Sequence, residues 1–322
     1  MAGDVEFYEP YGSFLPTPQH SLLILWDEIR VPHKPKKQVN RPTLPIIGIV
    51  VHPNLLKLTL SDVAQAHLST ELLKWSSKKT VRFPLHHWQK LCGWINWALN
   101  IFPLLRPCLN NVYPKLSGKT HQDQNICLNT SVCTDFQWAL LLLEKLPLIH
   151  LLCSLMWAPD QADVTILCDA CPTGMGFWIL STTAGFYTQS LYNDPPFIFY
   201  LEALCVLNAL LHASRSPPFR LKVLLYTDNQ NTVDIFSLLQ CLPDYNRLIK
   251  SSVDIWVASD IDLRVLHIPG EENQVANALS RADFMRALQI CPSLSLTPFC
   301  PDSASLPGPL NPPLELLGGV PT

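Results

Sequence analysis

The chain has 322 residues, of which 48% are hydrophobic and 15% are charged, and its formal net charge at pH 7 is −3. This length suits about two domains, and the hydrophobic share is high enough to build a buried core. The composition excludes a collagenous chain, a coiled coil, a polybasic tail protein and general disorder.

Charge is unevenly distributed along the chain. Residues 1–159 carry 15 Lys and Arg against 10 Asp and Glu, whereas residues 160–281 carry 7 against 13. A basic front part beside an acidic second part suggests a surface for a polyanion next to a site that collects carboxylates. Chance variation between two soluble domains explains the same counts equally well.

The 11 cysteines do not indicate a disulfide framework, because residues 1–20 are polar, acidic and proline-bearing and lack the pattern of a secretory signal. We expect an intracellular protein, cytoplasmic or nuclear, that is neither secreted nor membrane-bound. The single C-x-x-C, Cys168 to Cys171, has no second pair at zinc-ribbon spacing and is interpreted as the flank of a strand.

Residues 1–60 predict a short apolar helix at 21–29, a basic extended turn at 32–37 and then a β-hairpin. The hairpin is indicated by two apolar or alternating runs, 46–51 and 56–60, around Pro53 and Asn54. Residues 61–159 have helical periodicity, with Ser61 as a helix cap and further apolar helices at 85–105 and from about 131.

Residues 160–290 alternate between strand and helix patterns, which favours a mixed α/β sheet with flanking helices. Strands are predicted at 164–168, 174–180, 185–187, 221–227 and 263–268, and helices at 199–213, 232–239 and 274–279. Residues 291–322 are proline-rich and nearly uncharged, so this tail is predicted to be disordered.

Three acidic residues lie within otherwise apolar elements of the α/β region. Asp169 and Asp228 are predicted to end buried strands, and Glu202 lies in an apolar helix. Taken singly, Asp228 could cap a helix and Glu202 could be an ion-pair partner. Clustered buried carboxylates repel one another, so their joint presence predicts Mg²⁺ (or Mn²⁺) between them. Two such ions can support phosphodiester hydrolysis.

The order of these motifs resembles the ribonuclease H domain of retroelements over roughly 120 residues. Residues 168–176 are similar to its D-x-S/C-x-x-G-x-G opening, 201–204 to its helix-borne Glu segment, and 226–229 to its T-D-N/S strand end. Residues 267–281 closely resemble its H-x-P-G-x-x-N-x-x-A-D-x-L-S-R closing signature. The resemblance implies an RNase H-like fold with Asp169, Glu202 and Asp228 as metal ligands.

Upstream, residues 88–107 resemble the thumb and connection of reverse transcriptases from fungal DIRS-like (tyrosine-recombinase) retroelements, and residues 25–48 resemble the end of the polymerase palm. The resemblance implies a palm remnant at 1–60, a helical thumb and connection at 61–159, an RNase H-like domain at 160–290 and a tail at 291–322. It also implies that the chain starts after the polymerase active site, so no independent reverse transcriptase activity is expected. The sequence leaves open whether a separate polymerase subunit acts together with this chain in trans.

One position departs from the resemblance, because Asn277 stands where the family has a fourth metal-linked Asp. An amide oxygen can coordinate a cation but brings no charge. The histidine that acts as general base in some ribonucleases H is also missing, since Glu271 follows Gly270, and His267 is interpreted as a packed or edge residue.

The leading hypothesis is an RNase H-type endoribonuclease that cleaves the RNA strand of RNA·DNA hybrids, with Asp169, Glu202, Asp228 and Asn277 as catalytic residues. Basic residues of the front part are predicted to track phosphates, namely Lys34, Lys36, Lys37, Lys78, Lys79 and Arg82. The first alternative is a catalytically decayed fragment that at most binds nucleic acid. The second, a different two-metal or integrase-like nuclease, is disfavoured by the closing signature.

Overall fold

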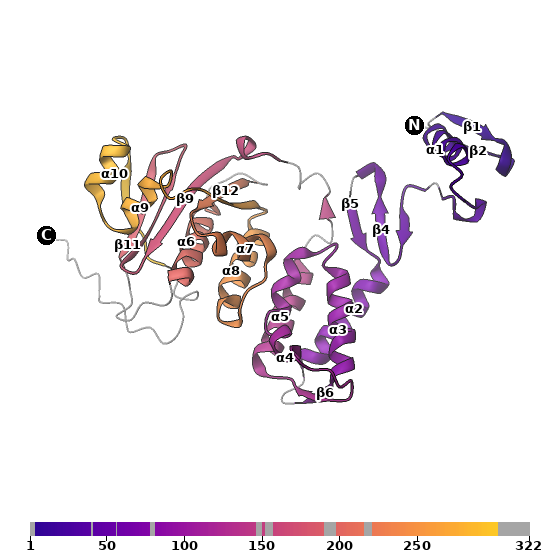
Figure 1. Ribbon diagram of the computed structural model, residues 1–322, viewed down its shortest axis with the longest axis horizontal. Helices are drawn as coiled ribbons and strands as arrows, with labels where there is room; N and C mark the ends of the chain where they lie inside the picture. Colours follow the sequence, from indigo (N-terminus) through magenta and orange to yellow (C-terminus); the bar gives the residue numbers. More distant parts are fainter. Residues whose placement is uncertain are drawn as a thin grey trace.

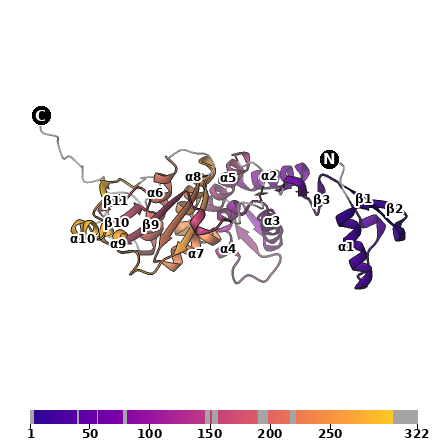
Figure 2. The same ribbon diagram turned by 90° about the horizontal axis from the view of Figure 1, so that it is seen from above.

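The computed structural model describes residues 4–39, 41–55, 57–77, 81–145, 150–151, 157–189, 198–215 and 221–301. The molecule is elongated, with the N-terminal elements at one end and α10 at the other (Figure 1). The view from above shows the same order along the long axis (Figure 2). No helix within the described ranges combines the length and hydropathy that crossing a bilayer requires.

The N-terminal elements form two small sheets. β1 (Val5–Tyr8) pairs with β2 (Ser13–Pro16), and the helix α1 (Thr17–Glu28) packs on both. The second sheet has the strand order β3-β4-β5-β8. Its strands are β3 (Leu44–Ile46), β4 (Ile49–His52), β5 (Lys57–Leu60) and β8 (His150–Leu151). The predicted hairpin is thus present as β4 and β5. The first predicted run is broken, because Ile47 and Gly48 both have positive φ and turn the chain between β3 and β4.

The middle of the chain is helical, as predicted. Its helices are α2 (Asp62–Ser76), α3 (Leu85–Ala98), α4 (Tyr113–Leu116) and α5 (Thr130–Lys145). They are accompanied by the short strands β6 (Arg82–Pro84) and β7 (Asn125–Cys127), which pair with each other. The Ser61 hydroxyl accepts a hydrogen bond from the Ala64 amide at 3.3 Å and caps α2. The helix predicted at 85–105 is too long, since α3 ends at Ala98 and a 3₁₀ segment, η4 (Pro103–Leu109), follows.

The C-terminal part is built on a six-stranded mixed sheet with the order β13-β12-β9-β10-β11-β14. Strands β9, β10 and β11 form an antiparallel meander, whereas β12 is parallel to β9 and β13 is parallel to β12. The meander consists of β9 (Val164–Cys171), β10 (Gly174–Ile179) and β11 (Ala184–Gln189). The other three strands are β12 (Lys222–Thr227), β13 (Asp262–His267) and β14 (Ser295–Pro298). The predicted mixed sheet with flanking helices, preceded by a mainly helical region with a β-hairpin, is confirmed.

The described residues of this part also form the helices α6 (Ile198–Ala213), α7 (Gln230–Leu238), α8 (Asn246–Ala258), α9 (Gln274–Ser280) and α10 (Phe284–Ile290). Helices α6, α7 and α9 pack on the sheet, α8 packs on α6, and α10 packs on α9. Helix α6 is apolar on almost every side and is correspondingly buried. Helix α8 was not predicted from the sequence. The disorder predicted for the tail is wrong at its start, because β14 pairs with β11 in parallel. Residues 302–322 lie outside the described ranges. The division into domains at 60, 159 and 290 stays a prediction.

One hydrophobic core runs through the helical region and the sheet, with Phe136 of α5 and Leu204 of α6 both completely buried in it. A buried polar network crosses the same junction. The Asp135 carboxylate of α5 accepts hydrogen bonds from Lys250 Nζ at 2.6 Å and from Asn246 Nδ2 at 2.9 Å, both on α8. The Asn111 amide adds a third at 2.7 Å. Apolar packing and charge pairing therefore both fix the helical region to the sheet.

Candidate metal centre

Three carboxylates converge beside β9. Asp169, Glu202 and Asp228 each offer a ligand atom, and these atoms lie within 4.8 Å of one another. Asp169 and Glu202 are only 3% and 4% exposed, whereas Asp228 is half-buried. Within the described residues, no other group of three or more His, Cys, Asp and Glu side chains is placed to hold a metal ion. The three residues singled out as predicted metal ligands are thus brought together.

Asp169 comes from the interior of β9, because that strand continues to Cys171, so the prediction that Asp169 ends its strand is wrong. It pairs in register with Gly176 of β10 and faces the helix α9. The Ser280 hydroxyl at the end of α9 donates a hydrogen bond to its carboxylate, and Arg281 Nη1 lies 3.7 Å from Oδ2. Burial raises the pKa of Asp169 to about 6, with the Ser280 hydrogen bond acting in the opposite direction.

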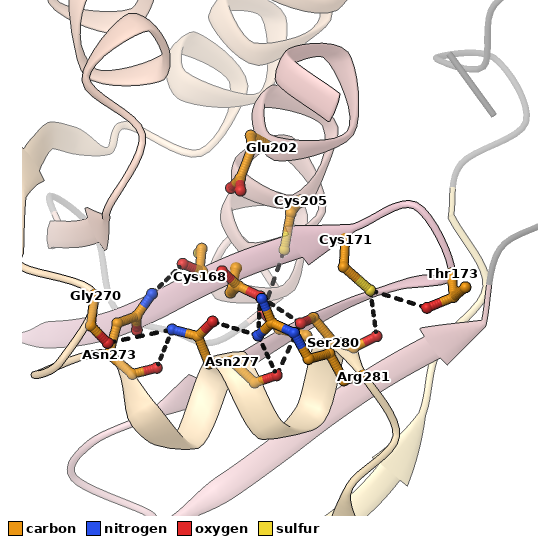
Figure 3. Close-up of polar contacts among 12 residues, drawn as sticks. Cys168, Cys171, Thr173, Glu202, Cys205, Gly270, Asn273, Asn277, Ser280 and Arg281 are labelled. Atoms are coloured by element: carbon orange, nitrogen blue, oxygen red, sulfur yellow. Dashed lines mark hydrogen bonds and ion pairs between the residues drawn. The ribbon is translucent and has the colours of Figure 1, made fainter. Parts of the chain in front are cut away.

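Glu202 projects from the second turn of α6 toward β9 (Figure 3). Among the described residues, no basic side chain lies within ion-pair distance of it, which removes the ion-pair interpretation for that part of the chain. The Thr227 hydroxyl, at 3.5 Å, is its side-chain hydrogen-bond partner. Burial, together with the negative charges of Asp169 and Asp228, raises the pKa of Glu202 to about 8.

Asp228 follows β12 directly, as predicted. The alternative that Asp228 caps a helix is wrong, because the side chain of Asn229 caps α7 by accepting a hydrogen bond from the Thr232 amide at 3.0 Å. Asp228 is therefore free to face the other two carboxylates. Its Oδ2 atom lies so close to the loop after β13 that a Cβ on Gly270 would approach it to 3.0 Å.

The glycines of the opening motif let α9 lie directly on the sheet. A Cβ built on Gly176 would lie 2.5 Å from the Leu279 Cβ and 2.6 Å from the Ser280 amide nitrogen. A Cβ on Gly174 would lie 2.5 Å from the Ser280 carbonyl oxygen. Since Ser280 and Arg281 both lie beside Asp169, the missing Cβ atoms of Gly174 and Gly176 are what allow the end of α9 to reach the carboxylates.

We predict that Gly176→Ala destabilises the fold by about 1–3 kcal/mol, because the new methyl group overpacks the contact between β10 and α9. Urea unfolding followed by circular dichroism measures the loss. The matched control is Gly93→Ala in α3, where a Cβ meets nothing within 4 Å. That change is expected to stabilise by up to about 1 kcal/mol, as an exposed helical glycine is replaced. Equal effects at the two positions would contradict the proposed contact.

Asn277, the predicted fourth ligand, lies on α9 with its side chain already engaged (Figure 3). Its Oδ1 atom accepts a hydrogen bond from Arg281 Nη1, and its Nδ2 atom donates to the Asn273 carbonyl at 3.1 Å and the Gly270 carbonyl at 3.4 Å. Any role of Asn277 as a ligand stays a prediction.

Three residues beside the carboxylates were not assigned a role from the sequence, although all belong to the closing signature. Ser280 and Arg281 contact Asp169 as described. Asn273 is completely buried and its Nδ2 atom donates to the Cys168 carbonyl at 2.8 Å, which ties the start of α9 to β9. Their position three or four residues from Asn277 was the available signal.

The remaining predicted site residues lie elsewhere. Lys34, Lys36 and Lys37 are exposed after α1, and Arg82 is exposed on β6. Figure 1 places α1 and β6 apart from each other and from α9, so these basic residues do not form one cluster. Lys78 and Lys79 lie outside the described residues. Contact of any of them with nucleic acid stays a prediction.

The C-x-x-C pair lies within β9 rather than on its flank. Cys168 and Cys171 are three residues apart on β9 and therefore point to opposite faces of the sheet, which prevents them from sharing an ion. His267, at the C-terminal end of the edge strand β13, is exposed, in line with the edge-residue interpretation.

No family model matches this chain, and no curated protein matches it. Among solved structures, it is similar to the RNase H1 of the halophilic archaeon Halobacterium salinarum NRC-1, with 17% identity and a TM-score of 0.30 over 37% of this chain and 98% of that one. It is also similar to LC11-RNase H1 in complex with an RNA/DNA hybrid, with 16% identity and a TM-score of 0.32 over 39% of this chain and 99% of that one.

A third similar structure is the foamy viral protease-reverse transcriptase in complex with an RNA/DNA hybrid, with 11% identity and a TM-score of 0.30. That similarity covers 86% of this chain and 58% of the viral one. The structures to which the chain is similar thus include RNase H domains and a reverse transcriptase. A DIRS-like or fungal origin stays a prediction.

Proposed function

We propose that this chain is a retroelement-derived ribonuclease H that hydrolyses the RNA strand of RNA·DNA hybrids. The observation that carries the proposal is the convergence of three carboxylates, two of them buried, within 4.8 Å. Such an arrangement is costly without a compensating cation, because each buried charge loses hydration and repels its neighbours.

The residues fit a divalent cation of the Mg²⁺ type, because such ions prefer carboxylate oxygens. When bound, they supply activation of water and stabilisation of the leaving oxygen of a phosphodiester. Asp169, Glu202 and Asp228 would hold them. Ser280 orients the Asp169 carboxylate from α9, and Thr227 does the same for Glu202 from β12. Asp169 of β9 and Glu202 of α6 are almost completely buried, so water has little access to the cluster from the side of these two elements.

Further parts of the proposal rest on the sequence. The hybrid would be recognised by its shape and 2′-hydroxyl groups rather than by base sequence, with the front-part lysines contacting phosphates. An intracellular location, an origin in a DIRS-like element and a polymerase subunit in trans belong to the same proposal.

The test is a cleavage assay in which purified protein with Mg²⁺ is offered an RNA·DNA hybrid, double-stranded RNA and single-stranded RNA. We expect cleavage of the RNA strand of the hybrid alone, leaving 3′-hydroxyl and 5′-phosphate ends. Equal cleavage of hybrid and single-stranded RNA would contradict the ribonuclease H assignment.

We predict that Asn277→Asp accelerates hybrid cleavage about tenfold or more, because it restores a negative charge beside Asp169 and so strengthens cation binding. Single-turnover rates measured against Mg²⁺ concentration check this. If the unsubstituted chain is inactive and the variant is active, the chain is a catalytically decayed ribonuclease H. If Asn277→Asp slows cleavage, the charge deficit is not what limits the site.

A further inference from the structure

The charge near the carboxylates is lower than three acids alone would give, because Arg281 belongs to the cluster. Its Nη1 atom lies 3.7 Å from Asp169 Oδ2, although the side chain is 55% exposed and could extend into water instead. At this distance a guanidinium and a partly buried carboxylate attract each other appreciably.

The position of Arg281 is fixed by Asn277. Arg281 Nη1 donates to the Asn277 carbonyl at 3.0 Å and also to Asn277 Oδ1. The amide is oriented in turn by its own donation to the Asn273 carbonyl. Figure 3 shows the Arg281 guanidinium lying between Asn277 and Ser280, on the side of α9 that faces the strand. The oxygen that a fourth ligand would offer is therefore used to hold an arginine.

The fixed charge of the site predicts how many divalent cations it binds. Three ionised carboxylates and one guanidinium carry a net charge of −2, which a single divalent cation neutralises. Four carboxylates without the arginine would carry −4, which two divalent cations neutralise. Every unit of uncompensated charge in a partly buried site costs free energy, so the number of bound cations follows the fixed charge.

We propose that this centre binds one divalent cation rather than two, and that Arg281, positioned by Asn277, supplies the positive charge that a second cation would otherwise bring. The inference rests on the proposed function, since it assigns an ion count to the same site. Arg281 is exposed on its outer side and can contact a phosphate of a bound hybrid while it remains beside Asp169.

The test counts bound Mn²⁺ by electron paramagnetic resonance, with the full chain bound to a hybrid whose RNA strand is 2′-O-methylated and cannot be cleaved. The Asp169→Asn variant under the same conditions supplies the count of ions held by the hybrid alone. We expect one additional Mn²⁺ for the unsubstituted chain, and two for Asn277→Asp combined with Arg281→Gln, with the spin coupling of a close Mn²⁺ pair in that variant alone.

Two single variants separate charge from folding. Arg281→Lys keeps the charge and is expected to keep one ion, and Arg286→Gln, which removes an exposed arginine of α10, is the matched control and is also expected to keep one. Two ions in the unsubstituted chain, or one in the double variant, would overturn this inference and leave the proposed function standing. No additional ion in any variant would overturn both.

Discussion

An Asp169→Asn variant is expected to cleave RNA·DNA hybrids at least about a thousandfold more slowly than the unsubstituted chain. Asp169 is at the centre of the site. Its carboxylate lies beside Ser280 and Arg281, and one of its oxygen atoms lies within 4.8 Å of carboxylate oxygens of Glu202 and Asp228. Losing its charge removes several kcal/mol of cation-dependent transition-state stabilisation, and about 4 kcal/mol corresponds to roughly a thousandfold.

The same variant is expected to fold more stably than the unsubstituted chain when EDTA is present. Asparagine has nearly the shape of aspartate, and it removes a buried charge that repels two others. Addition of Mg²⁺ should raise the melting temperature of the unsubstituted chain, because a ligand that binds only the folded state stabilises it. It should leave the melting temperature of the variant unchanged.

The control is Asp234→Asn, which removes an exposed carboxylate from α7 in the same part of the fold. It should change neither the cleavage rate nor the response to Mg²⁺. Differential scanning calorimetry and single-turnover cleavage measure both effects. An Asp169→Asn protein that is less stable in EDTA and still cleaves would show that the carboxylate is structural.

Lys250→Met is expected to destabilise the protein by about 3–5 kcal/mol, which is the usual cost of leaving a buried charge without its partner. The Asp135 side chain is 1% exposed and Lys250 is 14% exposed, so water cannot replace the lost ammonium group. The two asparagine amides that remain are hydrogen-bond donors without charge. Urea unfolding measures the loss.

The double variant Asp135→Asn with Lys250→Met removes both charges and should recover part of the stability. The matched control is Lys74→Met, because Lys74 pairs with Glu71 at 3.4 Å on the exposed surface of α2. Exposed pairs contribute at most about 1 kcal/mol. If Lys250→Met costs no more than Lys74→Met, the polar network does not hold the helical region against the sheet.

Local pattern was enough to predict most elements of the sheet region. The strand runs around Asp169 and Asp228 and the helix run around Glu202 are recognisable as continuous apolar segments of strand and helix length. The prediction was wrong where pairing decides the outcome: the strand at 295–298 lies in a proline-rich segment and forms because β11 offers it an edge. The continuation of β9 past Asp169 depends in the same way on pairing with β10.

The sequence by itself identified the three carboxylates that the fold brings together, because an acid inside an apolar run is informative without any knowledge of contacts. Charge totals also indicated that the acidic residues gather in the sheet region. The contacts that the last turn of α9 makes with Asp169 were decided only by the tertiary structure. Gly174 and Gly176 let that helix approach the sheet, and Asn277 then holds Arg281 beside Asp169 instead of facing the cluster.

The physical reason is that charge acts through distance in space, which sequence spacing does not specify. Arg281 is 112 residues from Asp169 along the chain and 3.7 Å from it in the fold. The same holds for Asp135 and Lys250, which are 115 residues apart and joined at 2.6 Å. Residue identity supplied the three carboxyl groups, and packing placed the Arg281 guanidinium beside one of them.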